Sequence, residues 1–178
     1  DYNKAIKINP KDTDAFTSRG LAYFAKGQYD RAIADYNKAI ELSPASDGAY
    51  NNRGTAYVNK GDKTRALLDY SKAIEINTSN SEAYFNRGNI YKDKGDIDNA
   101  ISDYSESIKI NPQNAHAYFN RGFIYQGKKE FNFAISDYGK AIEIDPNYSD
   151  AYLNRGNIYK DKGDIDYAIS DYSNVIKI

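Results

Sequence analysis

Residues 81–114 read SEAYFNRGNIYKDKGDIDNAISDYSESIKINPQN, and this 34-residue pattern recurs along the whole chain. The Arg-Gly pairs mark the period, because they begin at residues 19, 53, 87, 121 and 155. A fixed period of this length is typical of a solenoid, in which each repeat packs mainly on its neighbours. Such a stack builds a long binding surface and offers little means of making a single catalytic pocket.

The unit at 13–46 predicts the local structure of every repeat. Apolar residues recur at helical spacing on both sides of Gly27, which can end a helix with a positive φ. Pro44 ends the second helical segment. Each repeat is therefore predicted to be a helix, a short turn, a second helix and a short loop.

The third unit carries, in order, Tyr84, Arg87-Gly88, Tyr91, Ala100, Tyr104, Ser107 and Pro112. This order resembles the tetratricopeptide repeat (TPR), whose pattern is an aromatic residue, Leu-Gly, Tyr, Ala, an aromatic residue, Ala and Pro. The resemblance covers the entire chain and implies an all-α, right-handed solenoid of antiparallel helix pairs. Arg replaces Leu in every unit, and Thr78 replaces one Pro. Lys129 replaces the Gly between the helices, with Gly127 two residues earlier, which allows a different turn there.

The resemblance also implies one continuous TPR array over residues 1–178 with eleven helices. Residues 1–12 contain the second helix of a truncated repeat, and full or nearly full repeats follow at 13–46, 47–80, 81–114, 115–148 and 149–178.

Composition narrows the class of function. The net charge of −1 argues against a nucleic-acid partner, which a basic stripe would indicate. No apolar run approaches the roughly 20 residues of a membrane span. The absence of Cys excludes thiolate metal sites without fixing the compartment, and His116 is the single His. We therefore expect no enzyme activity, cofactor or bound metal.

Tyrosine supplies most of the predicted core, because the aromatic positions of the repeat are almost all Tyr. Core packing is a better interpretation of these rings than a stacking site for a cofactor or a base. Tyr29, Tyr148 and Tyr167 fall outside the pattern and are predicted to lie on the surface.

A recurrent Arg and a recurrent Asp have two interpretations, a row of anion-binding arginines or a structural ladder of ion pairs. The ladder is favoured, because an unpaired Arg would be costly to bury. Residues at equal distances on either side of the loop between two repeats should lie side by side, because the helices that the loop joins are antiparallel. This predicts ion pairs that join consecutive repeats, namely Asp1–Arg19, Asp35–Arg53, Asp69–Arg87, Asp103–Arg121 and Asp137–Arg155.

The first helices of TPR repeats line the concave face, where this chain repeats an Asn at 34-residue intervals: Asn52, Asn86, Asn120 and Asn154. An amide both donates and accepts hydrogen bonds, which suits a peptide backbone, although Asn could also be a tolerated polar residue there. The face adds Phe85, Phe119, Asn89, Phe123 and Asn157, of which the Phe residues could receive apolar side chains.

Two functions remain open. The first is a module that binds an extended peptide or partner segment in the groove. The alternative is a structural scaffold that assembles end to end through its repeats, since the two ends carry complementary repeat surfaces. The partner in either case is a protein.

Overall fold

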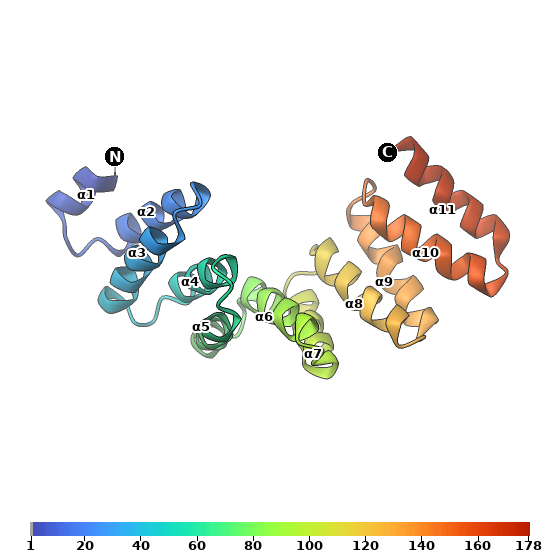
Figure 1. Ribbon diagram of the computed structural model, residues 1–178, viewed down its shortest axis with the longest axis horizontal. Helices are drawn as coiled ribbons and strands as arrows, with labels where there is room; N and C mark the ends of the chain where they lie inside the picture. Colours follow the sequence, from blue (N-terminus) through green and yellow to red (C-terminus); the bar gives the residue numbers. More distant parts are fainter. Residues whose placement is uncertain (1) are drawn as a thin grey trace. The chain divides into compact units, whose positions relative to one another are not determined.

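The structure is a computed structural model that describes residues 2–178, and these residues form eleven α-helices and no strand (Figure 1). The helices are α1 (Tyr2–Ile8), α2 (Thr13–Ala25), α3 (Tyr29–Leu42), α4 (Asp47–Asn59), α5 (Lys63–Ile76), α6 (Ser81–Asp93), α7 (Ile97–Ile110), α8 (Ala115–Gly127), α9 (Phe131–Ile144), α10 (Ser149–Lys162) and α11 (Ile165–Lys177). The predicted all-α solenoid of helix pairs is confirmed.

The helices form two compact units, Asp1–Ile90 and Tyr91–Ile178, and the division falls inside α6. In unit 1 the helix pairs are α2 with α3 and α4 with α5, and α3 also packs on α4. In unit 2 the pairs are α8 with α9 and α10 with α11. In addition, α7 packs on α8, and α9 packs on α10. Within each unit, a second helix therefore packs on the first helix of the next repeat, as shown by α3 with α4, α7 with α8 and α9 with α10. One continuous array remains a prediction.

A tyrosine of the second helix packs directly over a glycine of the first. A Cβ atom on Gly20 would lie 2.6 Å from the Tyr36 ring, and a Cβ atom on Gly54 would lie 2.7 Å from the Tyr70 ring. These separations are too short for two carbon atoms, so the glycine of the Arg-Gly pair is required by packing.

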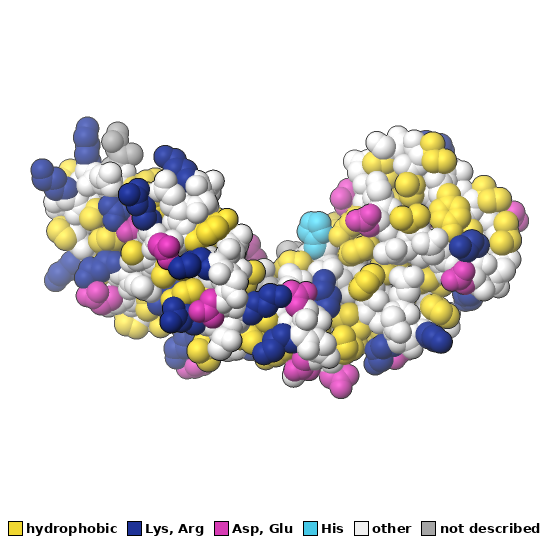
Figure 2. Space-filling model, in the orientation of Figure 1, with side chains coloured by type: hydrophobic (Ala, Val, Ile, Leu, Met, Phe, Trp, Pro, Cys, Tyr) yellow, Lys and Arg dark blue, Asp and Glu magenta, His cyan; other side chains and the backbone are white. Residues whose placement is uncertain are grey.

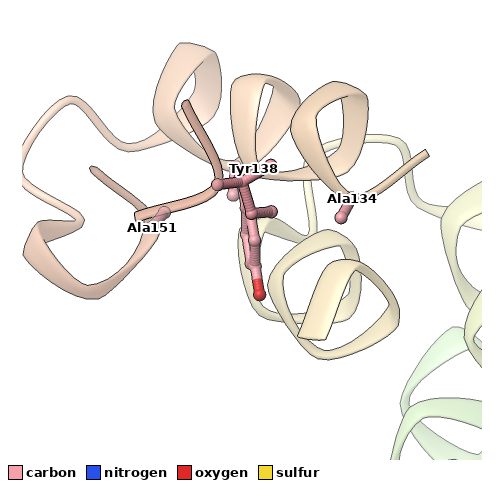
Figure 3. Packing of buried hydrophobic residues seen from close by; sticks show 5 residues of the cluster. Ala134, Tyr138 and Ala151 are labelled. Carbon is pink, nitrogen blue, oxygen red and sulfur yellow. The ribbon is translucent and has the colours of Figure 1, made fainter. Parts of the chain in front are cut away.

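Small residues complete the same arrangement in unit 2. Figure 3 shows the Tyr138 ring of α9 beside Ala134 of its own helix and Ala151 of α10, all three fully buried. The predicted tyrosine core is thus built from one large ring per repeat and the small side chains around it.

The rings outside the repeat pattern are less exposed than the sequence predicts. Tyr29 is half-buried against Phe24, with ring centroids 5.4 Å apart. Tyr148 is also half-buried, whereas Tyr167 is exposed as predicted. Tyr29 and Tyr148 reach the surface, but neighbouring rings on adjacent helices cover part of each ring.

The turns between the paired helices share one backbone conformation. Gly27, Gly61, Gly95 and Gly163 all have positive φ, and so does Lys129, with φ 61°. The Lys129 N–H donates to Gln126 at 2.9 Å, as Gly27 donates to Phe24 at 2.8 Å. The different turn that the sequence allows at Lys129 is therefore not formed. Instead, a non-glycine residue takes the left-handed conformation.

Candidate functional site

In four repeats, the recurrent Arg binds the recurrent Asp of its own repeat through two parallel hydrogen bonds. Arg53 Nε and Nη2 donate to the two carboxylate oxygens of Asp69 at 2.8 and 2.6 Å. The pairs Arg19–Asp35, Arg121–Asp137 and Arg155–Asp171 repeat this geometry. Asp69 is buried, and its hydrogen bond to Arg53 raises the pKa of the Arg above its ordinary value.

The predicted pairing between consecutive repeats was therefore wrong. Asp35 binds Arg19 of its own repeat instead of Arg53, and the same change of partner holds for Asp69 and Asp137. The predicted partner Asp1 lies outside the described residues. The reason is helix geometry: a residue that faces the previous helix cannot also face the next one.

The Arg residues nevertheless join consecutive repeats, through a different side chain. Arg53 Nη1 donates to Asn37 of α3 at 2.7 Å, and Asn37 lies two residues after Asp35. Two residues correspond to about 200° around a helix, so Asp35 and Asn37 point to opposite neighbours. Asn3, Ser71 and Ser105 accept the equivalent bond from Arg19, Arg87 and Arg121.

Most predicted peptide-binding asparagines already make hydrogen bonds inside the protein. Asn86 donates to Asn51 at 3.2 Å, and Asn51 donates to Glu82 at 3.4 Å. These three residues link the first helices α4 and α6 across unit 1. The side chain of Asn52 makes no hydrogen bond with any residue in 2–178.

In unit 2 the asparagines hold tyrosine hydroxyls. Asn120 bonds to the hydroxyl of Tyr104, and Lys92 Nζ donates to Asn120 at 3.4 Å. Burial raises the pKa of Tyr138, and a hydrogen bond with Asn154 partly offsets the rise. Tyr172 likewise donates to Asn157 at 2.9 Å. Three of the predicted binding residues thus also fasten the core, a role that sequence spacing alone did not reveal.

The phenylalanines of this surface differ in how much ring they expose. Phe119 stacks on Tyr148, with centroids 4.9 Å apart, and lies 5.6 Å from Tyr138. Phe85 and Asn89 are half-buried. Phe123 is 53% exposed, so it is the ring best placed to meet a ligand.

Phe123 lines an open pocket of about 380 Å³ within unit 2. The other lining residues are Lys92, Ile97, Ile124, Gly127 and Lys128. Asn120 precedes Phe123 by three residues on α8, so both lie on one face of that helix. The pocket side chains from α7 and the turn after α8 were missed by the sequence analysis, because no short-range pattern relates them to Phe123.

The profile of the TPR repeat matches residues 20–61, 54–95 and 88–129, and further tetratricopeptide repeat profiles match 115–148, 1–34 and 137–170. The chain belongs to the tetratricopeptide repeat family, a class of protein-interaction modules.

Solved structures agree on the fold. The crystal structure of MamA has a TM-score of 0.80 at 28% identity, over 89% of this chain and 92% of that one. PilF of Pseudomonas aeruginosa has a TM-score of 0.85 at 19% identity, over 95% of this chain and 78% of that one. YrrB, a TPR protein with an unusual peptide-binding site, has a TM-score of 0.78 at 24% identity, over 99% of this chain and 91% of that one. A comparison with curated proteins found no match.

Within residues 2–178, no helix has the length and apolar character needed to span a bilayer. Over the same residues, no three His, Cys, Asp or Glu side chains gather as they do around a metal ion.

Proposed function

We propose that this TPR protein binds an extended peptide or partner segment along its first-helix face, by which we mean Asn52, Phe85, Asn86, Asn89, Phe119, Asn120, Phe123, Asn154 and Asn157. The observation that carries the proposal is Phe123, half-exposed at an open pocket of about 380 Å³ on α8. A pocket of this size accommodates one large apolar side chain of a ligand.

Polar groups beside the pocket supply the remaining contacts. Asn120 lies on the same face of α8, and α10, which carries Asn154, contacts α8. An amide that holds one protein group still has further donor and acceptor positions, which can meet a ligand backbone. YrrB is a protein of this fold that has a peptide-binding site. At 24% identity, its similarity to this chain establishes only the shared fold.

The test uses peptides selected from a random displayed library against the wild-type protein, with affinities then measured by fluorescence anisotropy. Phe123→Asn is the decisive variant, because Asn89 and Asn157 occupy the same position in other repeats and fold there. We expect its affinity to fall about tenfold, since burying a Phe side chain contributes roughly 1.5–3 kcal/mol.

The double variant Asn86→Ala, Asn120→Ala should also weaken binding. Circular dichroism must show that this variant is still folded, because both side chains make hydrogen bonds inside the protein. Selected peptides that bind both variants as tightly as the wild type would show that this face is not the binding site.

We also propose self-association as a second function, from the exposed face of α11. Ile169 and Ile176 are 57% and 86% exposed, whereas the equivalent Ile135 and Ile142 of α9 pack into the core cluster beside α10. Uncovered hydrophobic side chains are visible over α10 and α11 in Figure 2.

The occupant of this face would be a second copy of the chain. Sedimentation over a range of concentrations tests the proposal: Ile176→Glu should abolish association, and a wild-type protein that stays monomeric throughout contradicts it.

A further inference from the structure

Two open pockets occur at the same place in two different repeats. The first, which we call the α9 turn pocket, has a volume of about 340 Å³ and is lined by Lys129, Glu130, Phe131, Asn132, Phe133 and Lys162. The second, the α3 turn pocket, has a volume of about 410 Å³ and is lined by Gly27, Gln28, Tyr29, Asp30, Arg31 and Lys60. Each residue of the first lies three repeats after its counterpart in the second. The two pockets are therefore an internal comparison of one site with different side chains.

The α9 turn pocket has an aromatic wall where the α3 turn pocket has a cation. Arg31 lies over the Tyr23 ring at 5.6 Å and donates to Gln28 at 3.2 Å. Its counterpart Phe133 packs beside Tyr125, with ring centroids 5.3 Å apart, and remains 61% exposed. The substitution replaces a charged group by an uncovered aromatic ring.

The lysine on the opposite side of each pocket also differs in its partner. In the α3 turn pocket, Lys60 forms an ion pair with Asp30. In the α9 turn pocket, Asn132 replaces that Asp, and Lys162 Nζ donates to its amide oxygen at 3.4 Å. The charge of Lys162 is thus not neutralised by a carboxylate of the pocket.

The second cation of the α9 turn pocket is Lys129, whose backbone conformation is strained. Lys129 has φ 61° at a position where every other repeat with a described turn has Gly. Glu130, the acid of the pocket, pairs with Lys128 at 3.1 Å. Neither Lys129 nor Lys162 forms an ion pair with any residue in 2–178. Backbone strain that persists beside a pocket is characteristic of binding sites.

We propose that the α9 turn pocket is a second binding surface, which takes a protein segment carrying an aromatic side chain next to carboxylates. The aromatic side chain packs against Phe131 and Phe133, and the carboxylates meet the ammonium groups of Lys129 and Lys162. This surface shares no residue with the first-helix face, so one chain can hold two different partner segments.

The test measures fluorescence anisotropy of a fluorescein-labelled peptide, Gly-Glu-Asp-Phe-Glu-Asp-Gly, titrated with the full chain at low ionic strength. The wild type should show saturable binding. Asn132→Asp installs the acid of the α3 turn pocket, and Phe133→Asn installs the uncharged residue found at the equivalent position 99; both are compatible with the fold, and each should lower the affinity about fivefold or more. The peptide with Ala in place of Phe, and the peptide with Lys in place of its acids, should not bind.

Lys129→Gly separates binding from stability. It should raise the thermal midpoint by relieving the positive φ, yet lower the affinity for the peptide, a combination that a purely structural residue would not produce. Phe123→Asn should leave the affinity for this peptide unchanged, because Phe123 does not line the α9 turn pocket. The proposal for the first-helix face and the proposal for this pocket can therefore be tested separately. The proposal is overturned if the wild type shows no saturable binding, if Phe133→Asn and Asn132→Asp bind as well as the wild type, or if Phe123→Asn abolishes binding.

Discussion

At the scale of single residues, the repeats differ in how they satisfy the buried tyrosine hydroxyl. Thr55 Oγ1 donates to the carbonyl of Asn51, so the hydroxyl of Tyr70 donates to Thr55, at 3.1 Å. The hydroxyl of Tyr36 is buried and has no hydrogen-bond partner among residues 2–178, because Leu21 stands where the second repeat has Thr55. A buried hydroxyl without a partner lowers stability by roughly 1–3 kcal/mol.

We therefore expect opposite effects from the same change at two equivalent positions. Tyr36→Phe should raise the free energy of unfolding by about 1 kcal/mol, because it removes an unsatisfied group. Tyr70→Phe should lower it by about 1 kcal/mol, because it breaks a hydrogen bond. Urea denaturation followed by circular dichroism measures both, and equal losses in the two variants would contradict the difference between the repeats.

At the scale of elements, the Arg side chain connects three helices of neighbouring repeats. Arg121 binds Asp137 in its own repeat and donates to Ser105 of the preceding repeat at 2.9 Å. Arg155 binds Asp171 of its own repeat in the same way, but Gly139 replaces the Ser, and a Cβ atom there would lie 3.4 Å from Arg155 Nη1. The contact between α9 and α10 therefore lacks one hydrogen bond that the equivalent contacts between other repeats have.

Gly139→Ser should restore this hydrogen bond. A bond to a charged group contributes about 1.5–3 kcal/mol, and removing a glycine from the middle of a helix adds a few tenths of a kcal/mol. Gly139→Ala is the matched control, because it gains helix propensity without an acceptor. Thermal unfolding should rank Ser above Ala above the wild type, and Ala at or above Ser would mean that the hydroxyl does not reach Arg155.

At the scale of the whole molecule, a core made of tyrosines connects stability to alkaline pH. Burial raises the pKa of Tyr36 and of Tyr70 to about 12, and it also raises the pKa of Tyr104 and of Tyr138. The ordinary Tyr pKa is about 10, so the unfolded chain releases these protons before the folded chain does. This contribution is fully present below about pH 10 and is lost as the pH rises through the folded pKa values.

The chain should therefore lose stability steeply between about pH 10 and pH 12. The fully buried Tyr70 hydroxyl should account for roughly 1–2 kcal/mol of that loss, after allowing for local relaxation. Urea denaturation at a series of pH values, with phenolate absorbance followed in parallel, measures it. Tyr70→Phe should show a shallower decline than the wild type, and an identical decline would exclude this hydroxyl as a source.

The sequence by itself determined the period, the helix pairs and the composition of the core, because each rests on spacing within one repeat. The requirement for Gly next to Arg follows from the same regularity, since a tyrosine ring lies over Gly20, Gly54, Gly122 and Gly156. Repetition also predicted which residues lie on the first helices, and hence the membership of the first-helix face.

The tertiary structure alone decided which partner each side chain has. Asp35 binds Arg19 rather than Arg53 because its direction around α3 selects the helix before it. Phe119 is covered by Tyr148 while Phe123 stays open, although both are Phe on one helix. Partner choice and exposure depend on where neighbouring helices place their side chains, and a repeat pattern, being identical for every unit, contains no information on those differences.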